Sequence, residues 1–402
     1  MFRKNIILLW LLLLGIASQA SPVCAEKPIR FNFYDDTIRL SWHLPERIYT
    51  DSSLSEEAVI RSYRLLSESD YRPLVNALLV YKSQHQLDDW FYYQLIRKTA
   101  EQISPKKQNY DEYTIVKWFL MARSHYDATL AISDNILLFY VRSDDNIYDI
   151  PSYTSNKRQY VCLNYHDYGS KIDFNSHTFN KIDVTIPAAE KAFSYRVTRM
   201  PEFRETDYAE KDISFRYRNR NYDFKVKVNP EVRNIFVNYP VVDYESYFNI
   251  PISKGTYNSF VPALREAVKG MSQKKGVDYL MRFTRNAFAY ENDQEAFGKE
   301  KRFSPEQTLL SDVSDCDDRA ALFFYLVREV YNLPMIVLLY PTHVTIAVRF
   351  DKQGNKGIVY KNSRYEVCEP TPQEENLPVG KLSPKLRHVP YQVAFEYHPS
   401  RN

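Results

Sequence analysis

Glycine is scarce in this sequence, and the few glycines are scattered along it. Only nine occur among 402 residues. A P-loop, a dinucleotide-binding fingerprint and the nucleophile elbow of a serine hydrolase all need clustered glycines, because their backbones turn tightly or approach a ligand closely. The sequence therefore excludes these three kinds of site.

An excess of charge of one sign is also missing. Lysine and arginine total 53, aspartate and glutamate total 50, and there is no dense basic run. Nucleic acid is therefore not an expected partner. The histidines other than His343 lack the paired spacing of metal ligands, so we expect neither a metal nor another cofactor.

Long apolar runs are confined to the N-terminus. Two basic residues precede an apolar stretch from Ile6 to Ile16, and small residues follow it. This order is typical of a secretory signal, and the stretch is too short to span a bilayer stably. We predict a signal peptide over 1–25, cleaved after Ala20 or Ala25, and export to the periplasm, the cell surface or the medium. No later run is long enough for a membrane span in the mature protein.

Cysteine is rare as well, with four in the chain. Cleavage after Ala25 would remove Cys24 and leave Cys162, Cys316 and Cys368. Three is an odd number, so at least one thiol is expected to be free. Cys162 and Cys368 fall inside apolar strand patterns, where a core position is the favoured interpretation.

The mature chain is too long for one hydrophobic core, and its patterns divide it into three parts. Residues 26–168 have helical periodicity followed by alternating strands, which predicts an α+β domain. Residues 169–252 contain short alternating runs separated by polar and proline turns, which predict a β-sandwich-like domain. Residues 253–402 return to helices followed by strands. The expected class is α+β.

An internal repeat connects the first and last parts. Tyr110 to Ile132 aligns without gaps on Cys316 to Leu338, and Cys162 falls on Cys368 at the same offset. In this alignment the N-terminal copy carries Tyr110, Leu137 and Leu163 where the C-terminal copy carries Cys316, His343 and Glu369. We therefore expect 26–168 to be a degenerate copy of 253–402. The alternative is a chance match between two helix-then-strand segments.

Cys316 lies where apolar helical periodicity begins, so we expect it at a helix N-terminus. The helix dipole there favours the thiolate, whereas the neighbouring aspartates oppose ionisation. A cationic partner is therefore needed, and His343, which enters a strand after a proline turn, is the candidate base. Glu369, at the end of a nearby strand before Pro370, could accept the other ring proton.

These three motifs, in this order and spacing, resemble the bacterial transglutaminase-like cysteine proteins, which share a papain-like core. The resemblance covers about Ala263 to Thr371. It implies that Cys316 is the nucleophile, His343 the general base and then acid, and Glu369 the orienting carboxylate. The orienting carboxylate in the family is usually an aspartate. Glu369 has one more methylene group, which changes the distance over which its carboxylate can reach the histidine. For the oxyanion hole, the Cys316 amide is one candidate donor, with Gln307 or Tyr290 as candidates for the other.

Two functions follow as hypotheses. The first is an exported transglutaminase-like cysteine protease, amidase or acyltransferase acting on amide bonds of a peptide or protein, such as one of the cell envelope. Its chemistry would be hydrolysis, deamidation or acyl transfer through a thioester, in a groove shaped by the polar loop from Glu291 to Ser314. The alternative is an inactive scaffold that uses the same fold to bind protein or glycan.

Overall fold

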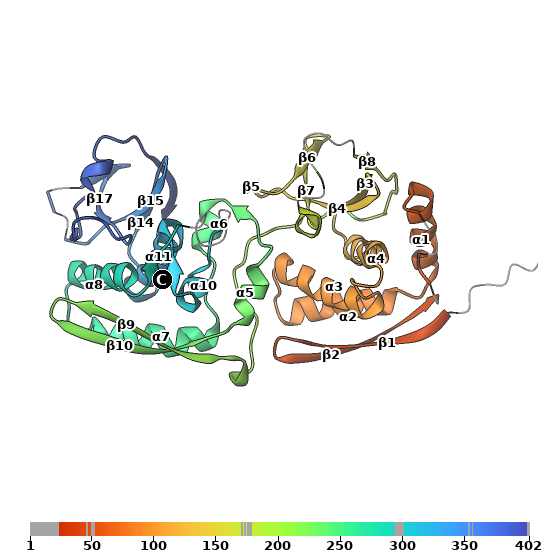
Figure 1. Ribbon diagram of the computed structural model, residues 1–402, viewed down its shortest axis with the longest axis horizontal. Coiled ribbons are helices and arrows are strands. Elements are labelled where there is room, and N and C mark those ends of the chain that lie inside the picture. Colours follow the sequence, from red (N-terminus) through yellow and green to blue (C-terminus); the bar gives the residue numbers. More distant parts are fainter. Residues whose placement is uncertain are drawn as a thin grey trace, which may run out of the picture.

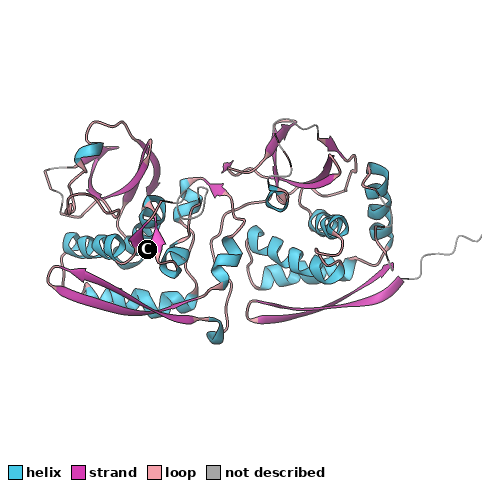
Figure 2. Cartoon of the chain, viewed as in Figure 1, coloured by secondary structure: helices cyan, strands magenta, loops and turns pink. Residues whose placement is uncertain are grey.

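In the computed structural model the chain forms two halves that lie side by side, each with a long hairpin along one side, a layer of helices, and a curved sheet on the other side (Figures 1 and 2). The structure describes residues 24–45, 47–49, 53–169, 172, 174, 179–292, 301–352, 354–355 and 357–399. The predicted signal peptide falls almost entirely on residues 1–23, outside the described residues.

The N-terminal half begins with a two-stranded hairpin and ends with a five-stranded antiparallel sheet in the order β6-β7-β4-β3-β8. Its elements are β1 (Cys24–Phe33), β2 (Asp36–Pro45), α1 (Glu56–Glu68), α2 (Arg72–Gln84), α3 (Asp89–Ile103), α4 (Tyr110–Arg123), β3 (Ala128–Ser133), β4 (Ile136–Arg142), β5 (Ile147–Tyr148), β6 (Ser152–Ser155), β7 (Arg158–Cys162), the 3-10 helix η1 (Tyr165–Asp167) and β8 (Asn180–Lys181).

The C-terminal half has the same plan, and its five-stranded sheet has the order β16-β17-β15-β14-β18. Its elements are η3 (Glu205–Asp207), β9 (Ala209–Tyr217), β10 (Arg220–Val228), α5 (Glu231–Phe236), β11 (Val241–Val242), α6 (Tyr244–Phe248), α7 (Lys254–Ala267), α8 (Gln273–Asn286), β12 (Ala289–Tyr290), α10 (Pro305–Leu310), β13 (Val313–Ser314), α11 (Cys316–Tyr331), β14 (Met335–Tyr340), β15 (His343–Val348), β16 (Ile358–Tyr360), β17 (Ser363–Cys368), η4 (Pro384–Leu386) and β18 (Gln392–Tyr397).

The two halves therefore repeat one topology, and the predicted α+β class is confirmed. Helices α4 and α11 begin at Tyr110 and Cys316, the two residues that the alignment placed together. A second correspondence lies in α3 and α8, where the hydroxyls of Thr99 and Thr284 each donate to the carbonyl four residues earlier, at distances of 2.9 and 3.0 Å.

Beyond the helix, the predicted residue matches are wrong by one position. Ser133 pairs with Ile136 across the β3–β4 hairpin, as Tyr340 pairs with His343 across β14–β15, so Ile136 rather than Leu137 corresponds to His343. Strand pairing likewise makes Cys162 equivalent to Val367. Asn164, rather than Leu163, therefore occupies the position in the first half that corresponds to Glu369 in the second. The connections between these elements differ in length in the two halves, and an alignment without gaps cannot show this.

The β-sandwich predicted for 169–252 is not formed by the described residues of that segment. They contain the single hairpin β9–β10, two short α-helices, one 3-10 helix and short strands. The inward side chains of the hairpin pack on helices instead, with Phe215 against Tyr279 of α8 and Phe224 against Phe260 of α7. Alternation identifies a strand with one buried face, but a helix layer covers that face as well as a second sheet does.

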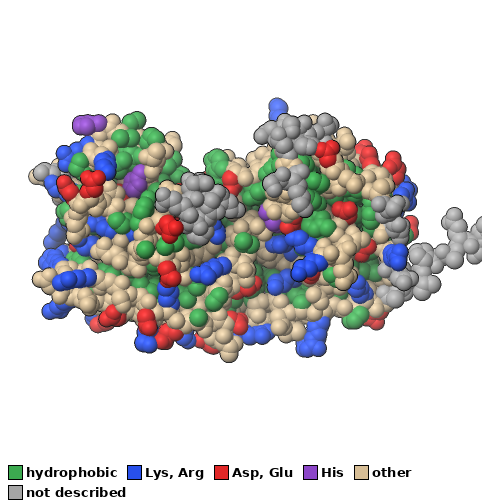
Figure 3. Space-filling view, viewed as in Figure 1, with side chains coloured by type: hydrophobic (Ala, Val, Ile, Leu, Met, Phe, Trp, Pro, Cys, Tyr) green, Lys and Arg blue, Asp and Glu red, His purple; other side chains and the backbone are tan. Residues whose placement is uncertain are grey.

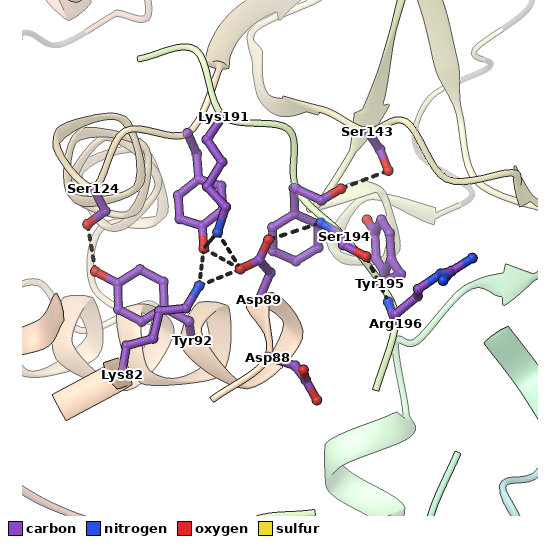
Figure 4. Close-up of polar contacts among 12 residues, drawn as sticks. Lys82, Asp88, Asp89, Tyr92, Ser124, Ser143, Lys191, Ser194, Tyr195 and Arg196 are labelled. Carbon is purple, nitrogen blue, oxygen red and sulfur yellow. Dashed lines mark hydrogen bonds and ion pairs between the residues drawn. The ribbon is translucent and has the colours of Figure 1, made fainter. Parts of the chain in front are cut away.

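The segment that joins the halves is fixed to α3 by a cluster of polar groups around Asp89 (Figure 4). The Oδ1 atom of Asp89 accepts from the Tyr126 hydroxyl at 2.6 Å and from Lys191 Nζ at 2.8 Å, and Lys82 Nζ also donates to it. The Ser194 amide donates to Oδ2 at 3.2 Å. Because Lys191 and Ser194 belong to the joining segment, this cluster holds that segment against the first half.

Charges of both signs are interspersed over the visible face of the molecule (Figure 3). Of the helices formed by described residues, none combines the length and apolar character needed to cross a membrane.

Candidate functional site

Cys316 occupies the first turn of α11, as its sequence context predicts. The side chain of Asp315 caps this helix by accepting from the Asp318 amide at 3.1 Å. The cap fixes where the helix starts, and therefore where the sulfur lies. Cys316 is half-buried, whereas Cys162 and Cys368 are fully buried. Of these three free thiols, Cys316 is the most accessible.

The surroundings of the Cys316 sulfur favour the neutral thiol. Burial raises its pKa well above the ordinary thiol value, and the carboxylates of Asp317 and Asp315 raise it further. Sγ donates to Asp317 Oδ1 at 3.5 Å. A backbone hydrogen bond with Val344 acts in the opposite direction, though more weakly. Burial and the two aspartates thus favour the neutral thiol over the thiolate.

His343 and Glu369 form a buried pair. His343 Nε2 lies 2.8 Å from Glu369 Oε2. A carboxylate only accepts hydrogen bonds, so Nε2 carries the proton and Nδ1 is left for another partner. Burial opposes the charged imidazole, but the hydrogen bond and charge of Glu369, with smaller contributions from Asp317 and Asp315, raise the pKa of His343 above its ordinary value.

The three predicted residues thus come from separate elements to one place. Cys316 Sγ is hydrogen-bonded to the backbone of Val344, the residue next to His343. This contact puts the thiol at the start of β15. His343 in turn contacts Glu369 just beyond β17. Glutamate is long enough to reach the ring, so the extra methylene does not break the pair. The other nearby acid, Glu366, binds Lys274 instead.

Arg285 holds the backbone that carries Glu369, a role that sequence reasoning did not assign. It is 4% exposed, its Nε donates to the Glu369 carbonyl at 3.1 Å and Nη2 donates to the same oxygen. Its Nη1 donates to the Leu377 carbonyl at 3.0 Å. The carboxylate itself is oriented by the Thr371 amide, which donates to Oε1 at 2.9 Å. Glu369 is therefore fixed at both its backbone and its side chain.

A second arginine, Arg319, connects the start of α11 to the end of α8. Its buried guanidinium donates to the carbonyls of Arg285 at 2.7 Å and Phe288 at 2.9 Å, and to that of Ser314 just before Cys316. Burial lowers the pKa of Arg319 to about 10, so it stays cationic at neutral pH.

The aspartate that follows Cys316 is held by Arg302. The Nε atom of Arg302 lies 3.1 Å from Asp317 Oδ2, and its Nη2 donates to the Tyr244 hydroxyl at 3.1 Å. The guanidinium carbon also lies 4.5 Å from the Tyr244 ring centroid. Arg302 comes from the polar loop that was expected to shape the groove, and residues 293–300 of that loop lie outside the described residues. No local signal distinguishes Arg302 from its charged neighbours.

Of the candidate oxyanion donors, the Cys316 amide has the most suitable position. It lies in the first turn of α11, where amides have no acceptor within the helix. Gln307 is buried, and its side chain caps α10 by accepting from the Ser304 amide at 3.0 Å. Tyr290 is 50% exposed, and its ring lies 5.6 Å from the Arg319 guanidinium carbon. The structure therefore gives Gln307 and Tyr290 other contacts.

The corresponding place in the N-terminal half has different chemistry. The Tyr110 hydroxyl donates to Asp167 Oδ2 at 2.5 Å and accepts from Asn164 Nδ2 at 3.2 Å. Ile136 stands at the histidine position. This half therefore has neither a thiol nor an imidazole at the equivalent point.

Within the described part of the chain, no three His, Cys, Asp or Glu side chains are grouped so that they could hold a metal ion. Neither a family model nor a curated protein matches the sequence.

Proposed function

We propose that this protein is an exported cysteine enzyme of transglutaminase-like type, which transfers acyl groups at amide bonds of a peptide or protein. The observation that carries the proposal is the arrangement of three side chains. His343 binds Glu369 through Nε2, and the residue beside His343 contacts Cys316 Sγ at a helix N-terminus. A nucleophile, a base and a group that orients the base are the parts that such chemistry requires.

The reaction starts from a neutral thiol. Nδ1 of neutral His343 takes the thiol proton as Sγ bonds to the substrate carbonyl carbon, and the negative charge that develops on the carbonyl oxygen is stabilised by amides in the first turn of α11. The imidazolium then protonates the leaving amine, which leaves a thioester on Cys316. Water or an amine then attacks the thioester carbon while His343 takes its proton, the carbon–sulfur bond breaks, and the imidazolium returns the proton to the Cys316 sulfur. Glu369 stabilises the imidazolium in both halves of the reaction.

A specific observation favours the second candidate, a binding protein with a retired site. The pKa of Cys316 is raised by burial and by two aspartates, and the thiol hydrogen-bonds to one of these carboxylates. A scaffold of this kind would bind protein or glycan without forming a covalent intermediate.

Acylation of Cys316 distinguishes the two candidates. The mature protein is incubated with p-nitrophenyl acetate, and the acetyl group is located by mass spectrometry of the peptides. We expect an adduct on Cys316 that forms about a hundredfold more slowly in His343→Ala, because a general base contributes about that factor or more. Cys162 and Cys368 are internal controls, since both are fully buried. A protein that acquires no acetyl group on Cys316, or acquires it equally fast in His343→Ala, is not this enzyme.

A further inference from the structure

A pocket of about 400 Å³ lies where the two halves meet, away from Cys316. Its lining includes residues at the tip of the β1–β2 hairpin and residues of the segment leading into α5. Figure 1 shows where these two parts of the backbone lie. Tyr34 and Lys98 line it from the first half, and Phe203, Asn229 and Glu231 line it from the second. Its volume lies within the range of small-molecule sites, which commonly form at the boundary between domains.

The charged side chains that line the pocket sum to a net charge of zero. Lys98 and Arg204 are cationic, and Asp207 and Glu231 are anionic. Arg204 Nε donates to the Asp35 carbonyl at 3.0 Å, which ties this cation to the hairpin tip. A pocket with donors and acceptors in similar number and no net charge suits a neutral ligand that both donates and accepts hydrogen bonds.

One buried donor in the lining has no partner in the described part of the chain. Asn229 is 1% exposed, and its Oδ1 accepts from the Glu231 amide at 2.9 Å. Its Nδ2 is buried and makes no hydrogen bond to any described residue. Buried amide donors are nearly always satisfied in folded proteins, and an acceptor from outside the chain, a water or a ligand oxygen, is one way to satisfy this one. A ligand oxygen beside Asn229 would supply it.

The aromatic wall of the pocket is held in an unfavourable backbone conformation. Tyr34 has φ of 55°, in the left-handed region that bulky residues seldom adopt. Its ring is fixed edge-on to Phe203 at 5.3 Å and to Phe91 at 6.1 Å between centroids. Residues 34 and 35 form the two-residue turn of the β1–β2 hairpin, and such turns need a positive φ, so the hairpin itself accounts for this conformation. Here it puts a tyrosine ring on the boundary between the halves.

We propose that this pocket binds a glycan, a neutral polyhydroxylated ligand of two or three sugar units. Sugar hydroxyls would pair with Lys98, Glu231 and the free amide of Asn229, while the apolar face of a sugar ring packs on Tyr34 and Phe203. The proposal goes beyond the acyl-transfer function and does not depend on it, since none of these residues belongs to the cysteine site.

The test is isothermal titration calorimetry of the full mature chain with maltose, cellobiose and N,N′-diacetylchitobiose. We expect at least one disaccharide to bind, with an affinity at least tenfold weaker in Tyr34→Gly and in Lys98→Ala. Glycine suits the left-handed backbone at position 34, and Lys98 is exposed, so both variants should fold. Tyr148→Ala removes a tyrosine that is 54% exposed and outside the pocket, and it should bind as the parent does.

Three results would overturn the proposal. The first is that none of the disaccharides gives a heat of binding up to about 10 mM. The second is that Tyr34→Gly and Lys98→Ala bind sugar as well as the parent does, and the third is that inorganic phosphate or free lysine binds in a way that depends on Lys98, which would indicate a charged ligand. Thermal melts establish whether each variant is folded. If Tyr34→Gly is unfolded, the affinity of Lys98→Ala alone decides the question. Cys316→Ala should bind sugar normally, so failure of the enzyme hypothesis and failure of this one are separate results.

Discussion

His343 and Glu369 lie 2.8 Å apart between Nε2 and Oε2, and 1% of the Glu369 side chain is exposed. A buried carboxylate beside an imidazole affects both the chemistry of the ring and the stability of the fold. The same contact therefore gives a prediction about each.

Glu369→Gln should lower the pKa of His343, because the glutamine has no negative charge to stabilise the imidazolium. NMR titration of the histidine ring protons measures this directly, with His343→Ala used to assign the signal. Glu374→Gln, a change at an exposed carboxylate, is the matched control. An unchanged His343 titration in Glu369→Gln would contradict the role assigned to the pair.

The same pair predicts how stability varies with pH. The folded-state pKa of His343 is raised, so its contribution is fully present below the unfolded histidine value of about 6.5 and is lost as pH rises through the folded-state pKa. The difference in free energy of unfolding between the parent protein and Glu369→Gln should therefore be larger at pH 5 than at pH 9. Urea denaturation at both values measures it, and a difference that grows with pH would refute the assignment.

Asp317→Asn should make Cys316 easier to ionise, because it removes one of the carboxylates that raise the pKa of the thiol. The rate of alkylation by iodoacetamide, followed against pH, should rise at lower pH than in the parent protein. Asp312→Asn is the control, since Asp312 is 94% exposed and is not among the carboxylates that raise the pKa of Cys316. Identical pH profiles for the parent and Asp317→Asn would show that the aspartate does not control the thiol.

Arg285→Met should slow acetylation of Cys316 by about tenfold through loss of the clamp on Glu369, and it should lower the free energy of unfolding by about 2 kcal/mol. Arg282→Met, on the same helix, removes an arginine that binds Asp278 and Asn376 but not Glu369. A purely structural arginine would slow acetylation no more than Arg282→Met does. Equal acetylation rates in the two variants would exclude a positioning role.

Asp89→Asn should destabilise the connection between the halves by about 3 kcal/mol, because it leaves Lys82 and Lys191 without their shared carboxylate. Burial raises the pKa of Asp89, but Lys82, Lys191 and Tyr126 together lower it below the ordinary value. The stabilisation is therefore present above the unfolded carboxyl pKa of about 3.9 and is lost as pH falls through the folded value. Urea denaturation at neutral pH should show a lower free energy of unfolding for Asp89→Asn than for the parent protein. The control Asp212→Asn, at an exposed carboxylate, should match the parent.

Much of the candidate site could be predicted from sequence, because its signals are local. The apolar periodicity that begins after Cys316, with an aspartate before it, specifies a capped helix start, and the structure begins α11 there. The proline turn before His343 specifies a strand start in the same way. These signals depend on residues within one or two turns of each other, so no knowledge of the rest of the fold is needed.

Other features depend on residues that the fold brings together from distant segments. The alternation in β9 and β10 predicted buried strands correctly, but helices α7 and α8, rather than a second sheet, cover them. The partners of Glu369 and Asp317, namely Arg285 and Arg302, come from other elements and carry no local mark. The correspondence of Asn164 with Glu369 also appeared only once strand pairing was known.

The sequence by itself therefore determined the class of the fold and the repeat of its helices, and it supplied the three candidate residues whose role stays a prediction. Periodicity, caps and turns act over a few residues, and each is written in consecutive letters of the chain. Only the tertiary structure decided which strand residues lie opposite one another, what covers the hairpins, and that burial and two aspartates raise the pKa of the Cys316 thiol. Those outcomes depend on loop lengths and on charges brought close by folding.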